Sequence, residues 1–291
     1  MAGAGMRDVK RRIKSVESTM QITKAMQLVA SSKLRRAKER VETARPSFNT
    51  LYETICAMAA GNTDKTNLYT CPREVRRKAY VVIAGDRGLA GGYNVNILRF
   101  AESQMDPETA LVIPVGKRAV DYFSRRAYET RVFQEYAAVE SIDLERSFEL
   151  ARLLTDLFRS GEADEVVLVY TEFASMLSQV PACRKILPLS FTAEELEGHS
   201  PADTFGAAEF DPSIGDVMAR IVPQFVGGMI FGAISESFAS EQAARRTAME
   251  AASDNAEEMI SSLSLAYNRA RQGAITQEIT EISSGFEALR Q

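Results

Sequence analysis

The chain has 291 residues, 45% of them hydrophobic and 25% charged, and a formal net charge of −4 at pH 7. This is an ordinary soluble composition, large enough for one large domain or two smaller ones. The three cysteines, Cys56, Cys71 and Cys183, are odd in number and widely separated. A disulfide framework is therefore not expected, and a reducing compartment is favoured. The single histidine, His199, lies in a polar stretch without another His or Cys nearby, so no metal site is expected there.

Two segments bear on membranes. The first residues, MAGAGMRDVKRRIKS, are basic but no apolar stretch follows them, so we expect no signal peptide at this end. The most apolar run, VPQFVGGMIFGAI at 222–234, has about 13 residues, too few to cross ~30 Å of hydrocarbon. Direct insertion into a membrane is not expected.

Residues 7–58 carry a regular apolar stripe with alternating spacings of three and four residues. The average of 3.5 is the heptad period of a left-handed coiled coil. The stripe predicts one long helix, with a bend or break at Pro46. Its members are Ile13, Val16, Met20, Thr23, Gln27, Ala30, Leu34, Ala37, Val41, Ala44, Phe48, Leu51, Ile55 and Met58.

The C-terminal segment has a similar stripe and no proline after Pro223. A helix over these residues would be roughly 100 Å long at 1.5 Å per residue, too long for a compact domain, so it needs a partner helix. Residues 7–45 have 12 basic and 4 acidic side chains, whereas residues 209–291 have 6 and 12. This opposite charge favours antiparallel pairing of the two ends. The expected C-terminal seam is Ala244, Ala248, Ala251, Asn255, Met259, Leu263, Ala266 and Ala270.

Between the helices the period changes. The runs KAYVVIAG (78–85), TALVIPVG (109–116) and EADEVVLVY (162–170) are rich in Val and Ile without alternation, which is typical of buried parallel strands. Helical stretches at 95–104, 117–126 and 144–159 separate or flank them, and ACRKILPLS (182–190) fits an edge strand. The predicted fold class is α/β: a long antiparallel coiled coil of the terminal helices with an inserted doubly wound α/β domain.

This pattern predicts four segments, in which the two long terminal helices are called the shaft helices. We expect the N-terminal shaft helix and its connection at residues 1–75, and the α/β globular domain at 76–192. Residues 193–208 form a linker, and 209–291 the C-terminal shaft helix.

The glycine-rich stretch GDRGLAGGYN at 85–94 follows the first strand, where a phosphate-binding turn often begins. It lacks the Lys and Ser/Thr of a Walker loop, and its spacing is not G-x-G-x-x-G. We interpret it as a structural loop in which glycines allow close packing. The loop comprises Gly85, Asp86, Arg87, Gly88, Gly91 and Gly92. No catalytic triad or acidic cluster with metal-ligand spacing is found, so no catalytic residue, metal or cofactor is expected.

Three motifs carry a family resemblance: IKSVESTMQITKAMQLVASSKLRRAKE (13–39), the glycine-rich stretch, and AMEAASDNAEEMISSLSLAYNRARQGAITQEITEISSGFEAL (248–289). Together they resemble the γ subunit of bacterial F-type ATP synthases over about 80 of the 291 residues. The resemblance implies a non-catalytic central-stalk rotor that couples transmembrane ion flow to ATP synthesis or hydrolysis. The implied partners are three α and three β subunits, the ε subunit and the membrane c-ring. The implied location is peripheral, at the cytoplasmic face of the bacterial plasma membrane.

The resemblance also implies contacts between the shaft and the α/β ring. Met26 is expected to slide past the β subunits, and basic residues of the first helix to meet acidic loops. Polar residues near the C-terminus are expected to latch a β-subunit loop. The expected contact residues are Met26, Lys33, Arg35, Arg36, Arg271, Gln272, Thr276 and Glu278. Ala90 and Arg246 stand where many family members have Cys and Met, and the chloroplast form's added cysteine pair is missing, so no thiol switch is expected.

Two alternatives stay open at this point. An α/β enzyme with helical arms that binds a small phosphorylated ligand would depend on Arg87 and Gly88. A coiled-coil scaffold could hold nucleic acid on its basic first helix, although residues 7–45 contain no aromatic side chain for stacking on bases. Neither alternative explains both ends of the chain, and no nucleic acid is expected as a partner.

Overall fold

The computed structural model describes residues 2–61, 68–71, 73–192 and 213–288. The expected linker at 193–208 and His199 within it lie outside the described residues. The chain divides into two units: unit 1 is Met1–Ala30 with Arg245–Gln291, and unit 2 is Ser31–Ala244. Two long helices, α1 (Ala2–Gly61) and α7 (Ile214–Ala288), contribute to both units.

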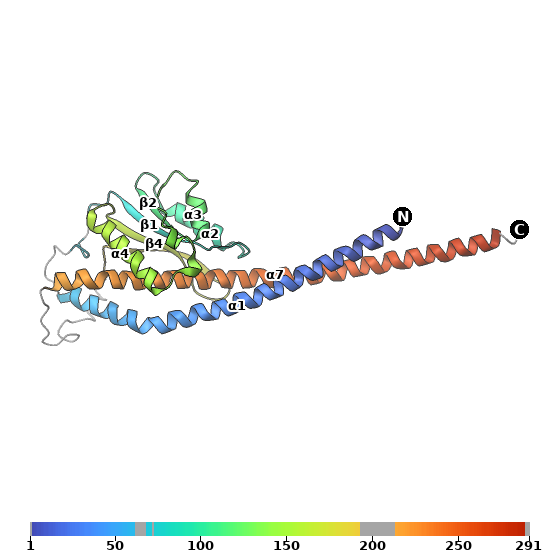
Figure 1. The fold of residues 1–291 in the computed structure, drawn as a ribbon, viewed down its shortest axis with the longest axis horizontal. Coiled ribbons are helices and arrows are strands. Elements are labelled where there is room, and N and C mark those ends of the chain that lie inside the picture. Colours follow the sequence, from blue (N-terminus) through green and yellow to red (C-terminus); the bar gives the residue numbers. More distant parts are fainter. Residues whose placement is uncertain (1, 62–67, 72, 193–212, 289–291) are drawn as a thin grey trace. The chain divides into compact units, whose positions relative to one another are not determined.

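Unit 2 contains a five-stranded sheet in the order β3-β2-β1-β4-β5 (Figure 1). Its strands are β1 (Lys78–Ile83), β2 (Ala110–Val115), β3 (Glu129–Thr130), β4 (Glu165–Phe173) and β5 (Gln179–Leu187). All neighbours are parallel except β4 and β5, which are antiparallel. Pro114 lies in β2 beyond the two residues that pair with β3, so its missing N–H is not needed on that side.

Helices cover both faces of the sheet, which confirms the doubly wound architecture. Helices α2 (Tyr93–Gln104) and α3 (Lys117–Phe123) close one apolar core, in which Ile97 and Phe123 meet Val82. The opposite core holds α4 (Leu144–Ser160) together with parts of α1 and α7. Two short 3₁₀ helices, η1 (Gln134–Tyr136) and η2 (Val139–Ser141), connect β3 to α4.

Within unit 2, α1 and α7 pack against each other in opposite directions. The Phe48 and Phe231 rings have centroids 6.1 Å apart, and the Tyr52 and Phe225 rings 6.0 Å apart. Farther along, the small core of Leu34, Ala37, Ala239 and Ala243 continues the same contact. Higher numbers in α1 thus meet lower numbers in α7, as an antiparallel pair requires. Pro46 does not end the first helix, because α1 continues to Gly61.

Unit 1 continues the antiparallel pair. The hydroxyl groups of Thr23 and Ser253 are buried and lie 2.7 Å apart in a hydrogen bond. Every α1 position of the predicted stripe is buried or half-buried, so that prediction is confirmed. The predicted α7 seam is wrong at five of its eight positions, because Ala251, Asn255, Met259, Ala266 and Ala270 are exposed, whereas Ala244, Ala248 and Leu263 are half-buried. The side that is actually covered contains Arg245, Met249, Ala252, Ser253, Ala256, Ile260, Leu263 and Tyr267.

One stretch of α7 is long and apolar enough to cross a membrane when judged by length and composition alone. The apolar run is therefore longer than the sequence analysis assumed. More than half of it is buried inside the protein, however. Val222, Val226 and Ile230 belong to the core between the sheet and α4. Burial in that core accounts for the composition.

The neighbouring glycines Gly227 and Gly228 let α7 approach two elements at once. A Cβ on Gly227 would lie 2.1 Å from Cδ1 of Phe148 in α4, and one on Gly228 would lie 2.5 Å from Cδ1 of Phe48 in α1. Both distances are far below a normal contact, so these positions require the smallest side chain.

The substitution Gly227→Ala should therefore lower the free energy of unfolding by about 1–3 kcal/mol through overpacking. The matched control is Gly232→Ala in the same helix, where an added Cβ meets no atom within 4 Å. Alanine at that position should be neutral or stabilising, by up to about 1 kcal/mol of helix propensity. Denaturant unfolding of both full-length variants checks this, and equal effects of the two substitutions would contradict the packing described.

A second prediction concerns pH. Burial, reinforced by the nearby Glu172 carboxylate, raises the pKa of the Glu236 carboxyl, against the lowering effect of a backbone hydrogen bond from Phe173 and of the Arg184 and Arg45 charges. The folded state thus favours the neutral acid, and this contribution to stability is lost as pH rises through the folded-state pKa. Glu236→Gln should increase the melting temperature relative to the native chain at pH 8 and much less at pH 4. Glu53→Gln at an exposed position of α1 is the matched control, and equal changes in melting temperature for the two variants at both pH values would contradict this account.

Candidate functional site

The basic run of α1 lies in unit 2 and has a buried side and an exposed side. Leu34 and Ala37 are buried against α7. Arg35 is exposed and forms a long ion pair with Glu39, at 3.7 Å between Nε and Oε1. Lys33 forms an ion pair with Glu140 of η2. The ion pairs of Lys33 and Arg35 thus go to the globule and to α1 itself, and not to α7 as their charge had suggested.

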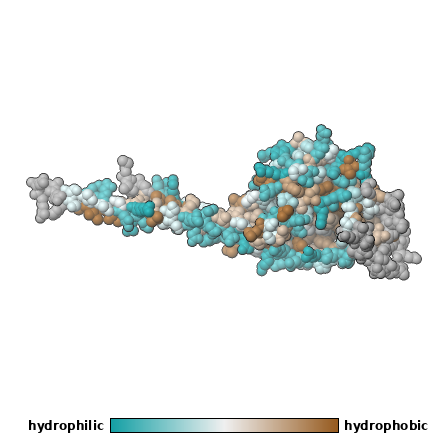
Figure 2. Space-filling view, turned by 180° about the vertical axis from the view of Figure 1, so that it is seen from behind, coloured by the Kyte–Doolittle hydropathy of each residue, from teal (hydrophilic) through white to brown (hydrophobic). Residues whose placement is uncertain are grey.

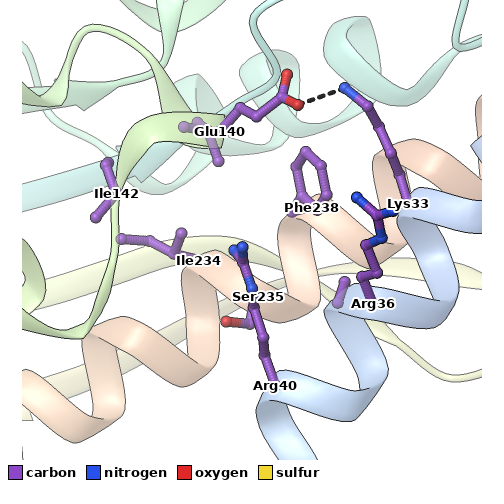
Figure 3. A pocket seen from close by; sticks show the side chains of 10 residues that line it. Lys33, Arg36, Arg40, Glu140, Ile142, Ile234, Ser235 and Phe238 are labelled. Carbon is purple, nitrogen blue, oxygen red and sulfur yellow. Dashed lines mark hydrogen bonds and ion pairs between the residues drawn. The ribbon is translucent and has the colours of Figure 1, made fainter.

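A cavity of about 190 Å³, here called the shaft pocket, lies where α1, α7 and η2 meet (Figure 3). Lys33, Arg36 and Arg40 extend toward it from α1, as Figure 3 shows. The guanidinium groups of Arg36 and Arg40 have no hydrogen-bond or ion-pair partner within the described parts of the chain. The remaining lining residues include Glu140, Ile142, Ile234, Ser235 and Phe238. The pocket therefore combines an apolar wall with two uncompensated guanidinium groups, a combination suited to a carboxylate carried on an apolar segment.

Met26 lies in unit 1 on the part of α1 around the Thr23–Ser253 bond. It is half-buried, whereas its neighbours Ile22 and Val29 are 57% and 56% exposed. Brown, hydrophobic surface is visible along this helical pair in Figure 2. The helix thus has apolar side chains outside the seam that its partner helix covers, which is the sign of a further contact surface.

Four expected contact residues lie on the last turns of α7: Arg271, Gln272, Thr276 and Glu278 are all exposed. The Thr276 hydroxyl donates to the Gln272 carbonyl oxygen at 3.0 Å, within the helix. In this unit α7 continues past the N-terminal end of α1 (Figure 1).

The sequence analysis missed the apolar residues interleaved with this polar set. Ile275, Ile279 and Ile282 are exposed by 44%, 62% and 73%. Their spacing of three to four residues was the available signal, because it places them on one side of a helix.

The glycine-rich loop is organised by Asp86. Its carboxylate accepts hydrogen bonds from the backbone N–H groups of Lys117 at 3.2 Å, Val139 at 3.0 Å and Glu140 at 3.2 Å. The first of these groups begins α3, so an internal carboxylate already occupies the start of that helix. An external phosphate would have to displace Asp86 from these donors.

The rest of the loop is packed closely. The Asn94 side chain accepts from the Gly85 N–H at 2.9 Å and donates to the Arg87 carbonyl at 3.1 Å. A Cβ on Gly85 would lie 2.7 Å from the carboxylate of Glu241, a buried residue of α7. Gly91 has a φ of +54°, which favours glycine. Nothing in the sequence pattern indicated that Glu241 reaches this loop.

The chain is similar in sequence to proteins of known families. The family model described as ATP synthase matches residues 5–289. The ATP synthase gamma chain of Ruminococcus albus is 48% identical over 287 residues, covering 97% of each chain. The sodium ion specific gamma chain of Acetobacterium woodii is 42% identical, covering 98% of each.

The fold agrees as well. A chain in the structure of the Euglena gracilis mitochondrial ATP synthase has a TM-score of 0.68 at 22% identity, covering 99% of this chain and 95% of that one. The fold is thus one found in ATP synthase assemblies. The chain belongs to the ATP synthase gamma-chain family.

The contacts of Asp86 generate a prediction. Asp86→Ala removes one charged acceptor from three backbone donors, and hydrogen bonds to charged groups contribute about 1.5–3 kcal/mol each when well buried. Because the site is half-buried, we expect a loss of about 2–4 kcal/mol in unfolding free energy. Asp121→Ala is the matched control, since Asp121 is exposed and has no partner in the described structure; it should change stability by less than about 0.5 kcal/mol. A neutral Asp86→Ala would show that the loop does not depend on this carboxylate.

Proposed function

We propose that the chain is the rotor subunit of the central stalk of an F-type ATP synthase. It would couple transmembrane ion flow to ATP synthesis or hydrolysis by turning inside a ring of three α and three β subunits. The observation that carries this proposal is unit 1, an antiparallel helical pair from which α7 continues alone with exposed polar and apolar side chains. A helix with such a surface is stabilised by surrounding protein.

The α1 side of unit 1 would form an apolar contact with the β subunits that changes during a turn at little energetic cost. Ile22 and Val29 are exposed around Met26, and the methionine side chain is unbranched and flexible. A flexible apolar side chain can adapt to neighbours that change during a turn at modest cost.

The shaft pocket would receive acidic loops of the β subunits. Arg36 and Arg40 provide unpaired charge, while Lys33 is held by Glu140. Attraction at such exposed sites is weak for any one pair and acts mainly in guiding each encounter. Weak contacts suit a surface that must be released at every step.

The four polar residues near the end of α7, Arg271, Gln272, Thr276 and Glu278, would hold a loop of a β subunit in one rotational position and release it in the next. Arg271 and Gln272 offer hydrogen-bond donors and Glu278 an acceptor, all on exposed turns of α7. An asymmetric shaft that binds one conformer of a β site more tightly than another shifts the populations of the three sites in sequence. Ion flow would drive the rotation, with about 2.3 kcal/mol available per charge per 100 mV.

In this account the chain itself is non-catalytic, and nucleotide would react on the β subunits. The loop that most resembles a phosphate cradle has its α3 donor satisfied by Asp86, which supports a structural role. The globular part of unit 2 would contact the ε subunit and the membrane c-ring. The complex would place the chain at the cytoplasmic face of a bacterial plasma membrane as a peripheral protein. The division into segments 1–75, 76–192, 193–208 and 209–291 is likewise part of this proposal.

Reconstitution tests the proposal. The full-length chain is added to the α and β subunits of its own organism, and Mg-ATP hydrolysis is followed with and without it. We expect a stable complex whose turnover depends on the chain and falls about ten-fold in the double variant Arg271→Ala/Gln272→Ala, equivalent to about 1.4 kcal/mol of transition-state stabilisation.

The matched control is Arg220→Ala/Gln224→Ala, which removes the same two residue types from exposed positions near the other end of α7. This control should keep full turnover. Failure of the chain to associate with α and β, together with hydrolysis or nucleotide turnover by the chain alone, would contradict the rotor and favour the enzyme alternative.

A further inference from the structure

A second cavity in unit 2 shares no lining residue with the shaft pocket. It has a volume of about 620 Å³ and is bordered by the glycine-rich loop, α2, α3 and the residues after α3. We call it the arginine cleft. Four arginines line it, Arg99, Arg118, Arg125 and Arg126, together with Gly88 and Gly91 of the loop. None of these arginines takes part in the rotor contacts proposed above.

One of the four arginines is already neutralised. The Arg126 Nε donates to Oε1 of Glu102 at 2.7 Å, and its guanidinium lies 4.2 Å from the ring centre of Tyr122. The Tyr122 hydroxyl donates to the other oxygen of Glu102 at 2.6 Å. This arrangement fixes the Tyr122 ring as a wall of the cleft.

The guanidinium groups of the other three arginines remain available. Arg99, Arg118 and Arg125 are exposed, and their side chains form no ion pair or hydrogen bond within the described ranges. Among the described residues that line the cleft, Asp121 is the only acid. Three free guanidinium groups against one carboxylate leave an excess of positive charge around a single cavity, and guanidinium groups repel one another until an anion binds between them.

The position of Arg118 brings this charge to the glycine-rich loop. Its Nη2 atom lies 3.2 Å from where a Cβ on Gly88 would stand. Gly91 has open space on its Cβ side. The Arg118 guanidinium thus lies against the side of Gly88 that a larger residue would fill, and Gly91 adds no side chain to the rim of the cleft, so a ligand can approach the guanidinium there.

We propose that the arginine cleft binds a small molecule with a di- or triphosphate chain. Guanidinium groups bind phosphate oxygens in bidentate geometry, and arginines from α2, α3 and the segment after α3 converge on one cavity. The volume falls within the range of about 300–1,000 Å³ that small ligands occupy. Val95, Leu98 and Tyr122 give the cleft an apolar side that could accept a nucleoside. The proposed site uses none of the backbone N–H groups that Asp86 accepts from, and it binds its ligand without catalysing a reaction.

Isothermal titration calorimetry of the full-length chain tests this site, with inorganic tripolyphosphate and ATP without magnesium as the two probes. Arg99→Ala/Arg118→Ala should weaken binding at least about ten-fold, because charge-assisted hydrogen bonds are lost. The control Arg152→Ala/Arg220→Ala removes the same charge from exposed positions on α4 and α7 and should change affinity less than two-fold. Thermal unfolding of both variants verifies that they fold.

The two probes separate the sources of the anion. Equal affinity for both shows that the phosphate chain is recognised, and tighter binding of ATP shows that the apolar side contributes as well. Absence of binding, or equal loss in both double variants, would overturn the proposal. So would binding of a hexaglutamate peptide in place of the phosphates, because the cleft would then be a surface for an acidic protein segment. These results are independent of assembly with α and β, so they do not decide the rotor proposal.

Discussion

The structure depends on one constraint: helices of 60 and 75 residues cannot bury their apolar stripes without each other. The ends of the chain satisfy it by pairing in opposite directions, through aromatic contacts in unit 2 and a buried hydroxyl pair in unit 1. Polar pairs in a helical seam specify register at some cost in stability. Thr23 and Ser253 therefore fix which turns of α1 and α7 face each other, and hence which side chains remain outside.

The globular part of unit 2 connects to this pair through polar groups as well as through its core. The Asp86 carboxylate accepts from the Glu140 N–H, and the Glu140 carboxylate pairs with Lys33 of α1. From the other helix, Glu241 reaches Gly85 at the start of the same loop. The glycine-rich loop is thus a junction between the end of β1, the start of α3 and both long helices. This accounts for its glycines without a bound phosphate in the loop itself.

Sequence reasoning predicted the elements with strong periods and missed those that tertiary contacts define. The α1 seam was correct because large apolar residues such as Leu34, Phe48 and Ile55 recur along it with the heptad period, even though Ile22 and Val29 lie outside it. The α7 seam was placed on the wrong residues because alanines occur all around that helix, and because the true seam contains the polar Arg245 and Ser253. The two-residue strand β3 has no pattern of its own. The shaft pocket and the arginine cleft combine residues far apart in sequence, so no local motif indicates them.

The central claim is that this chain rotates, and direct observation of rotation tests it best. In a Cys71→Ala variant, the exposed Cys183 thiol on β5 is the attachment point of this chain for a visible probe, since Cys56 is buried. The complex with α and β is fixed to a surface through its β subunits, and ATP is added. The account predicts stepwise rotation of the probe in one direction, with a rate that follows ATP concentration. Hydrolysis of ATP by the same labelled complexes without any rotation of the probe would contradict it.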